Sequence, residues 1–215
     1  MIKSTLKGNL IVISGPSGSG KDTIVNEIVN DKIKVSISAT TRPQRKNEVD
    51  GIHYYFMSKK EFEDKINNDE FLEFAQVHQT DYYGTLKSEV EKDLNSGKDV
   101  VLVIDVIGAL QIKEKYPDAV FIFILPPSVQ VLKQRLIKRE SENMQTMIKR
   151  FNSLYKEITK INEYNYVVVN DELDLAVMEV KSIIKSEHLK TNYIEDVIVD
   201  TDEERVLQEI IDFYS

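Results

Sequence analysis

Three of the chain's eight glycines fall in one short segment that could bind phosphate groups. This segment consists, in order, of Gly15, Pro16, Ser17, Gly18, Ser19, Gly20, Lys21 and Asp22. Glycines at this spacing let backbone N–H groups point at phosphate oxygens where a helix begins, and the lysine reaches the outer phosphates. A strand-like run precedes the segment and a helix-like run follows it. The pattern therefore favours a nucleotide phosphate site (a P-loop) over a simple glycine-rich turn.

One position of this P-loop departs from the usual pattern. The residue after the lysine is normally Ser or Thr, whose hydroxyl binds Mg²⁺, but here it is Asp22, with Thr23 one place later. We expect that Asp22 binds the metal directly or that Thr23 takes over. A second carboxylate, Asp105, ends a strand-like run at the edge where open α/β sheets bind ligands. It could hold Mg²⁺ or cap the following turn.

Arginine is scarce in this sequence, so its positions are informative. Six arginines stand against twenty-two lysines. Arg42 and Arg45 follow the second predicted strand, whereas Arg135, Arg139 and Arg150 lie in or beside a charged segment at residues 138–146. Guanidinium groups on two sides of a site could clamp phosphates with paired donors. The alternative is ordinary ion pairing on helix faces, which we favour for Arg205.

Glu73 lies among apolar residues in a segment that is rich in tyrosine and threonine. The same segment also contains Tyr54, Tyr82, Tyr83 and Thr85. A carboxylate can accept two parallel N–H donors, which guanine presents through N1–H and its 2-amino group and adenine does not. The histidines at 53, 78 and 188 have no metal-ligand spacing and are predicted to be structural or surface residues.

Alternating strand-like and helix-like segments predict an α/β layered fold with a mostly parallel five-stranded sheet. The predicted strands are residues 10–14, 35–38, 100–105, 120–125 and 166–169. The predicted helices are residues 22–30, 129–139, 144–161 and 173–186, with Ser128 as the N-cap of the second. Residues 39–98 interrupt the alternation and are predicted to form an insertion with its own small sheet.

Composition limits the classes of protein to consider. The chain has 215 residues, no cysteine, a net charge of −8 and no apolar run of membrane-spanning length. Eight of its acids lie in residues 191–215, where an apolar face predicts an amphipathic terminal helix. We expect a cytoplasmic protein that does not bind nucleic acid, because it lacks the basic stripe that such binding needs.

Taken together, these residues resemble the guanylate kinase family over about residues 8–188. The resemblance rests on the P-loop and on further ordered matches, which are Ser38 to Pro43, Asp50–Gly51, Glu70 to Ala75, Tyr82 to Thr85, Ile104 to Val106, Pro126 to Ser128 and Val169 to Asp171. It implies a P-loop fold for residues 1–190. The core would comprise about 8–38 and 99–188, the GMP-binding insertion about 39–98 and the lid about 135–150, followed by the extension 191–215.

The resemblance also implies a role for individual residues in Mg²⁺-dependent phosphoryl transfer from ATP to GMP. Ser38, Glu73 and Thr85 match positions that bind guanine, and Arg42, Arg45, Tyr54 and Tyr83 match positions that bind the GMP phosphate. The P-loop with Lys21 would bind the ATP phosphates, and Asn170 would lie near adenine. The phosphoryl-transfer set is then Lys21, Arg42, Arg135, Arg139 and Arg150. A monomer or homodimer is expected.

Three departures leave two other interpretations open. Besides Asp22, Val103 replaces an acid that is usual in the family, and Glu140 replaces a glycine. An Asp after the P-loop lysine is also found in ribose 1,5-bisphosphate phosphokinase, a relative that the chain is similar to at this point. A non-catalytic guanylate-kinase-like module that binds a protein is the other alternative, although such modules typically lose phosphate-binding residues that are present here.

Overall fold

The computed structural model describes residues 7–77, 80–138, 156–190, 208 and 212. Five parallel strands form its large sheet in the order β2-β7-β1-β8-β9. They are β1 (Leu10–Ser14), β2 (Ile33–Val35), β7 (Asp99–Val103), β8 (Val120–Leu125) and β9 (Tyr166–Val169). The predicted five-stranded parallel sheet is therefore confirmed.

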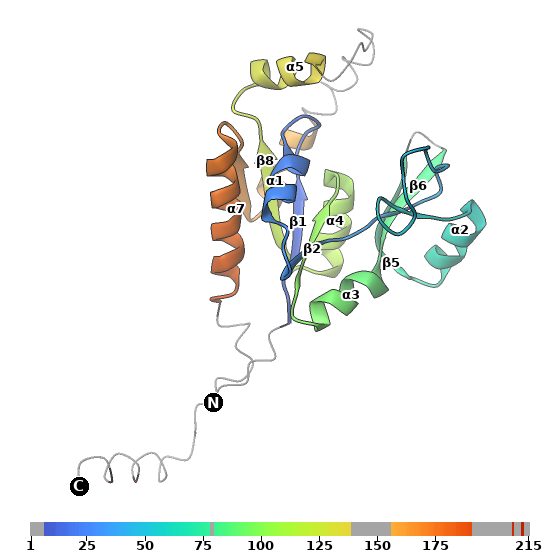
Figure 1. Cartoon of the computed structure of the whole chain (residues 1–215), viewed down its shortest axis with the longest axis horizontal. Helices are drawn as coiled ribbons and strands as arrows, with labels where there is room; N and C mark the ends of the chain where they lie inside the picture. Colours follow the sequence, from blue (N-terminus) through green and yellow to red (C-terminus); the bar gives the residue numbers. More distant parts are fainter. Residues whose placement is uncertain (1–6, 78–79, 139–155, 191–207, 209–211, 213–215) are drawn as a thin grey trace.

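Helices cover both faces of this sheet at its three central strands, β7, β1 and β8, which are apolar on both sides. On β1, Ile11 and Ile13 face α1 (Lys21–Ile28) and α7 (Leu173–Glu187), and all of these contribute to one buried cluster. Leu10 and Val12 point the other way, into a second cluster with α3 (Lys87–Asn95) and α4 (Val106–Lys115). Figure 1 shows α1 and α7 on one side of the sheet and α3 and α4 on the other.

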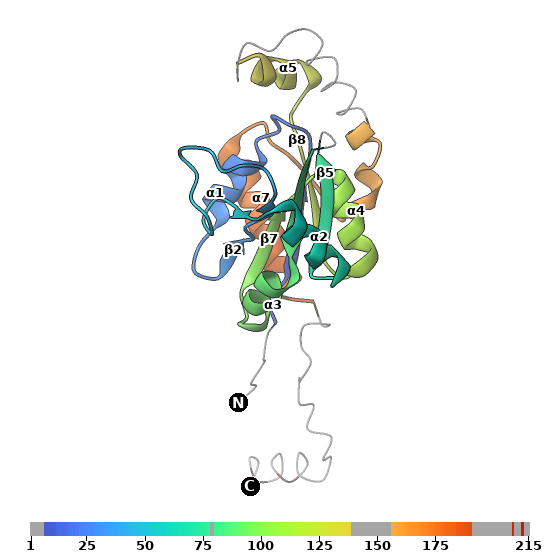
Figure 2. The same ribbon diagram turned by 90° about the vertical axis from the view of Figure 1, so that its right-hand side faces the viewer.

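A four-stranded sheet with the order β4-β3-β6-β5 lies to one side of the large sheet in Figure 1 and in front of it in Figure 2. It contains β3 (Ala39–Thr40), β4 (Tyr55–Phe56), β5 (Phe71–Val77) and β6 (Asp81–Leu86), and it packs against α2 (Lys59–Asn67). Phe62 of α2 stacks on Phe71 and Tyr82, with ring centroids 4.2 and 5.2 Å away. The small sheet predicted within residues 39–98 is thus present.

Several predicted elements differ from the observed ones. The second strand is Ile33–Val35 and not residues 35–38, because after Ser36 bonds to the Val101 carbonyl the chain crosses to the small sheet. Helix α4 was not among the helices predicted from the sequence, because its buried face begins in a nearly continuous apolar run. The predicted helix 144–161 lies largely outside the described residues, and a short 3₁₀ helix, η1 (Ile161–Glu163), occurs at its end.

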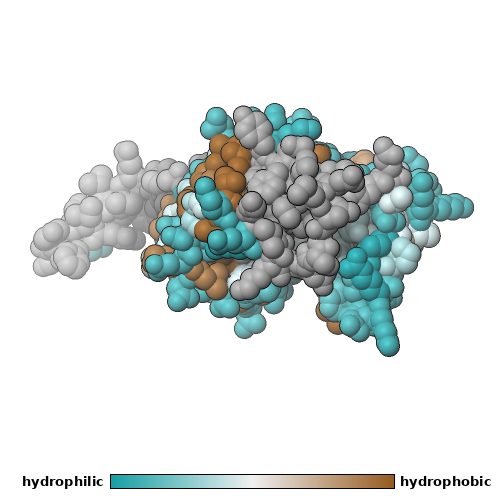
Figure 3. All heavy atoms as spheres, turned by 90° about the horizontal axis from the view of Figure 1, so that it is seen from above, coloured by the Kyte–Doolittle hydropathy of each residue, from teal (hydrophilic) through white to brown (hydrophobic). Residues whose placement is uncertain are grey.

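Helix α5 (Val129–Lys138) lies beyond the carboxyl end of the large sheet. The Val131 N–H donates to Ser128 Oγ over 3.1 Å, which confirms Ser128 as the cap at its start. Figure 3 looks down on this end of the molecule and shows mainly hydrophilic side chains over the part that holds the small sheet. In the described part of the chain, no helix is long and apolar enough to cross a membrane.

Candidate active site

The P-loop connects the carboxyl end of β1 to α1, as the sequence predicts. Gly15, Gly18 and Gly20 have φ angles of 143°, 85° and 92°, which side chains rarely adopt. A Cβ at Gly15 would come within 2.2 Å of the Ile124 carbonyl oxygen, and one at Gly20 within 2.1 Å of Asn170 Nδ2. Both glycines are therefore required for the loop to pass so close to the neighbouring strand ends.

The loop surrounds one side of a cleft of about 350 Å³ at the carboxyl end of the sheet. Lys21, Asp22 and Asp105 are among its lining residues, and Val103 and Glu157 line it as well. Thr23 is exposed on α1 and does not line the cleft. Lys21 Nζ donates to the carbonyl oxygens of Gly15 and, over 3.1 Å, of Pro16.

Asn170 holds the P-loop through a side-chain hydrogen bond. Its Nδ2 donates to the Ser19 carbonyl over 2.8 Å, and its own carbonyl accepts from Arg135 Nη2 over 3.2 Å. Asn170 is buried, and it links α5 to the end of β9 through its backbone carbonyl and the end of β9 to the loop through its side chain. The predicted lid residues Arg139 and Arg150 lie outside the described residues, as does Glu140.

Asp105 caps the helix that follows β7. Its Oδ1 accepts from the Gly108 N–H over 2.8 Å at the start of α4. The capping interpretation is confirmed by this bond, while the carboxylate also lines the cleft. A role in metal binding remains a prediction.

Arg42, Tyr54 and Tyr83 come together in the small-sheet region. Arg42 Nε donates to Tyr83 Oη over 3.2 Å, and its guanidinium carbon lies 5.5 Å from the centre of the Tyr54 ring. The two tyrosine rings meet edge to face, with centroids 6.0 Å apart. Three residues predicted to hold one phosphate are therefore neighbours.

Glu48, which sequence reasoning missed, organises this cluster. Its Oε1 accepts from Arg42 Nη2 over 2.8 Å, and its Oε2 accepts from the backbone N–H of the exposed Arg45 over 2.8 Å. The bond to Glu48 is the main cause that raises the pKa of Arg42, and the same bond holds the pKa of Glu48 below its usual range. The sequence does place this acid three residues after Arg45 in a turn-rich segment, and that spacing could have indicated a partner for the arginines.

Glu73 and Thr85 face each other across β5 and β6. Thr85 Oγ1 donates to Glu73 Oε1 over 2.7 Å, and both side chains are buried. Burial raises the pKa of Glu73 to about 7, the Thr85 bond opposes this rise, and the nearby Asp105 carboxylate adds to it. Ser38 precedes β3, and its carbonyl accepts from the Tyr55 N–H over 2.9 Å.

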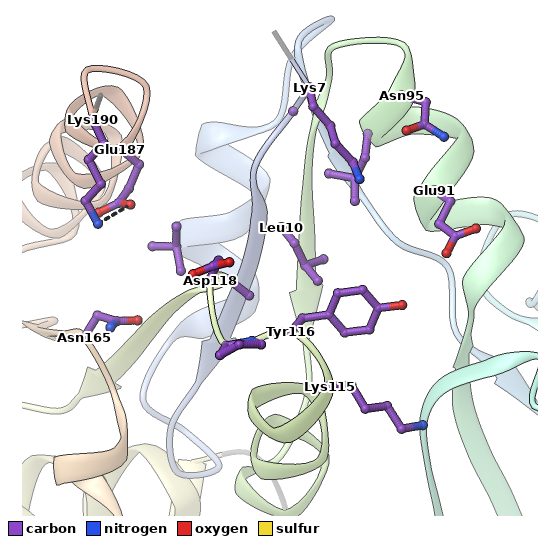
Figure 4. A pocket seen from close by; sticks show the side chains of 15 residues that line it. Lys7, Leu10, Glu91, Asn95, Lys115, Tyr116, Asp118, Asn165, Glu187 and Lys190 are labelled. Atoms are coloured by element: carbon purple, nitrogen blue, oxygen red, sulfur yellow. Dashed lines mark ion pairs between the residues drawn. The ribbon is translucent and has the colours of Figure 1, made fainter. Parts of the chain in front are cut away.

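A larger cavity, of about 560 Å³, lies at the opposite end of the sheet (Figure 4). Leu10, Tyr116 and Glu91 line it, and Glu187 forms an ion pair with Lys190 at 2.7 Å on its α7 side. None of the residues predicted to bind nucleotide lines this cavity. The candidate active site is therefore the smaller cleft with the P-loop, together with the adjoining polar groups of the small sheet.

Comparisons with known proteins show which family the chain belongs to. The sequence model of the family described as guanylate kinase matches residues 7–187. The chain belongs to the guanylate kinase family. Guanylate kinase of Clostridium tetani is 50% identical over 207 residues, which cover 96% of this chain and 99% of that protein. Guanylate kinase of Caldanaerobacter subterraneus is 49% identical and covers 93% of this chain and 98% of its own length.

A solved structure is similar as well. The crystal structure of guanylate kinase from Anaplasma phagocytophilum has a TM-score of 0.71 and 31% sequence identity, covering 93% of this chain and 94% of its own. The P-loop fold predicted from the sequence is thereby confirmed, since that protein and this chain share their architecture over nearly their whole lengths.

Proposed function

We propose that this chain is a guanylate kinase that transfers the terminal phosphoryl group of ATP to GMP, giving ADP and GDP. The observation that carries the proposal is the pairing of a P-loop cleft with a buried carboxylate, Glu73, in a member of this family. The cleft suits the polyphosphate of one nucleotide. Glu73 suits the guanine base of the other.

The guanine site would use Glu73, Thr85 and Ser38. In its ionised form Glu73 accepts N1–H and the 2-amino group of guanine, and the hydrogen bond from Thr85 already holds the carboxylate in place. Adenine presents an acceptor at N1 and lacks the 2-amino donor, so it would leave the buried carboxylate unpaired. Such an unpaired group is the physical basis of strong discrimination.

The phosphate of GMP would be held by Arg42, Arg45, Tyr54 and Tyr83. Arg42 already has its guanidinium fixed by Tyr83, Glu48 and the Pro43 carbonyl, which prepares its remaining donors for a planar interaction with phosphate oxygens. An oxygen of this phosphate attacks the terminal phosphorus of ATP, and the bond from that phosphorus to the ADP oxygen breaks. No covalent nucleophile on the protein is needed.

Phosphoryl transfer requires alignment and positive charge more than it requires bond-making groups on the protein. Lys21 supplies charge at the outer phosphates, where phosphate oxygens replace the loop carbonyls as acceptors of its ammonium hydrogens. Arg135, Arg139 and Arg150 would add charge from the lid. Closure of the predicted lid would exclude water, which would otherwise hydrolyse ATP. Asn170 would lie near adenine while holding the P-loop.

The donor set of the cleft fits Mg²⁺ bound together with ATP. Among the residues that the structure describes, no three His, Cys, Asp or Glu side chains gather as a self-sufficient metal site. Mg²⁺ characteristically binds through one or two carboxylates, water and substrate phosphates. Asp22 and Asp105 line the cleft and would hold it, which favours Asp22 over Thr23 because Thr23 does not line the cleft. When bound, the ion would neutralise phosphate charge.

The alternative functions are less well supported. A ribose 1,5-bisphosphate kinase would explain Asp22 but would have no use for a buried carboxylate prepared for guanine. A protein-binding module would not need Lys21 and Arg42 in position for phosphates. The boundaries of the core, insertion, lid and extension, a monomeric or dimeric state and a cytoplasmic location stay predictions.

A panel of phosphoryl acceptors tests the proposal. ADP formation from ATP would be measured with GMP, dGMP, AMP and ribose 1,5-bisphosphate at equal concentrations. We expect GMP to be the best acceptor, dGMP to be accepted, and AMP to be at least about 1,000-fold poorer in kcat/KM, as hydrogen-bonding sites allow. Turnover with ribose 1,5-bisphosphate and none with GMP would contradict the proposal.

A further inference from the structure

Strand β5 lies at the edge of the small sheet, and its outer side is covered by α4. The side chain of Gln111 on α4 makes two hydrogen bonds to one residue of this strand. Its Oε1 accepts from the Phe74 N–H over 3.1 Å, and its Nε2 donates to the Phe74 carbonyl over 3.0 Å. This is the exchange of two bonds that a neighbouring strand residue would supply.

Phe74 is the residue next to Glu73, and α4 also approaches Glu73 directly. A Cβ placed on Gly108 would lie 2.9 Å from Glu73 Oε2, so this helix leaves the carboxylate only the room that a glycine provides. Glu73 is thus bonded on one side by Thr85 and faces Gly108 of α4 on the other, while Gln111 of the same helix bonds the backbone of the next residue.

The strand is irregular at this point, which makes its position dependent on outside contacts. The pairing of β5 with β6 shifts register between Phe71 and Glu73. Leu72 packs into the core of the large sheet, whereas Phe71 packs into the core of the small one. The side chains just before Glu73 therefore pack into two different cores. The paired bonds from Gln111 connect the backbone at Phe74 to α4, a helix of the large sheet.

We propose that Gln111 is a positioning residue for guanine recognition: its amide serves as a substitute strand partner that fixes the Glu73 carboxylate against the base. This inference rests on the proposed function. It predicts that loss of the two bonds impairs the reading of the 2-amino group more than it impairs ATP binding, because Gln111 is not among the residues that line the P-loop cleft.

The test compares Gln111→Met with the unaltered chain. Methionine keeps the length and most of the volume of glutamine but cannot form the paired bonds. The measured quantity is the ratio of kcat/KM for GMP to that for inosine monophosphate, which lacks only the 2-amino group. We expect this ratio to fall about tenfold, mainly through a higher KM for GMP, with the KM for ATP unchanged within about twofold.

Two further measurements separate positioning from general damage. Hydrogen exchange at the Phe74 amide should be at least about tenfold faster in Gln111→Met, because its acceptor is gone. Glu114→Ala, an exposed change on the same helix, should alter neither the ratio nor this exchange rate. Should Gln111→Met fail to fold, Gln111→Glu keeps the acceptor and loses the donor, and it should also lower the ratio.

The outcomes are distinguishable. An unchanged ratio in folded Gln111 variants, or equal losses with GMP and inosine monophosphate, would overturn the inference about Gln111 alone. No phosphorylation of GMP by the unaltered chain would overturn the proposed function and this inference with it.

Discussion

Thr85 Oγ1 donates a hydrogen bond of 2.7 Å to Glu73 Oε1 across two antiparallel strands of the small sheet. One oxygen of the carboxylate is therefore fixed, and the other lies next to Gly108 on a helix of the large-sheet core. The Glu73 carboxylate, which is predicted to bind guanine, therefore lies where the small sheet meets the large-sheet core. It is buried there, in an environment where hydrogen bonds discriminate strongly between bases.

Replacing Glu73 with glutamine should remove guanine recognition. The amide would present an N–H group to one of the two guanine donors, so we expect kcat/KM for GMP to fall at least about 100-fold. Steady-state kinetics with GMP would measure this, and Glu63→Gln, an exposed change on α2, should stay within about twofold of the unaltered chain. A loss below about threefold in Glu73→Gln would contradict the assignment.

GMP binding should depend on pH through Glu73. Burial raises the pKa of this carboxyl to about 7, yet guanine requires the ionised form. Below pH 7 the dissociation constant for GMP should therefore rise by about tenfold per pH unit beyond the change due to the phosphate of GMP itself. Calorimetry in two buffers of different ionisation enthalpy would detect proton release on binding at pH 6.

The matched control for this pH dependence is the Glu73→Gln variant, which cannot release that proton and is measured at the higher GMP concentrations that its weaker binding requires. Equal proton release in both proteins would show that Glu73 does not titrate in this range.

The same carboxyl should influence stability with a definite sign. A folded pKa of about 7, against a normal value of 4.5, means that the folded state binds the proton more tightly. This group therefore lowers the free energy of unfolding as the pH rises from 4.5 to 7, by up to about 3 kcal/mol. In denaturant unfolding, Glu73→Gln should raise the free energy of unfolding, relative to the unaltered chain, by more at pH 8 than at pH 4.5. A larger gain at pH 4.5 would contradict the raised pKa of Glu73.

Arg42 should not be replaceable by lysine. A lysine has the charge but not the planar set of donors that reaches Tyr83, Glu48 and a phosphate together. Arg42→Lys should raise the KM for GMP at least about tenfold and leave the KM for ATP nearly unchanged. The exposed Lys60→Ala serves as the control for a charge change on the same subdomain. A parallel rise in both KM values would argue against a role specific to GMP.

Asp22 should determine how the metal is used. If its carboxylate holds Mg²⁺ beside ATP, Asp22→Ala should raise the Mg²⁺ concentration for half-maximal rate by about tenfold, while Asp22→Ser should restore part of the loss. Calorimetry of an ATP analogue with and without Mg²⁺ provides a measurement independent of turnover. Glu27→Ala on the exposed side of α1 is the control, and unchanged metal dependence in Asp22→Ala would exclude the idea.

The strands that the sequence predicts best are those with continuous apolar, β-branched runs. β1 and β8 have the expected bounds because such runs have one stable place, inside a sheet covered on both faces. The edge strand β9 also has the expected bounds, although Val167 and Val169 are exposed. The second strand is displaced because its end depends on where the chain leaves β7 for the small sheet, which no local pattern records.

Site residues with a local pattern could also be predicted, whereas their partners could not. The P-loop glycines and Lys21 follow from spacing alone. Gln111 acts on Phe74, 37 positions away in the sequence, and its role exists only because α4 packs against the edge of β5. The raised pKa of Glu73 has the same origin, since burial of that carboxyl follows from tertiary packing and not from its neighbours in the chain.

The most direct test of the central claim is a time course with purified chain, ATP, GMP and Mg²⁺, in which ADP and GDP are quantified separately. Phosphoryl transfer predicts that the two diphosphates appear in equal amounts, that GMP falls in step, and that little ADP forms when GMP is left out. ADP formation without GDP, or no reaction with GMP, would contradict the account.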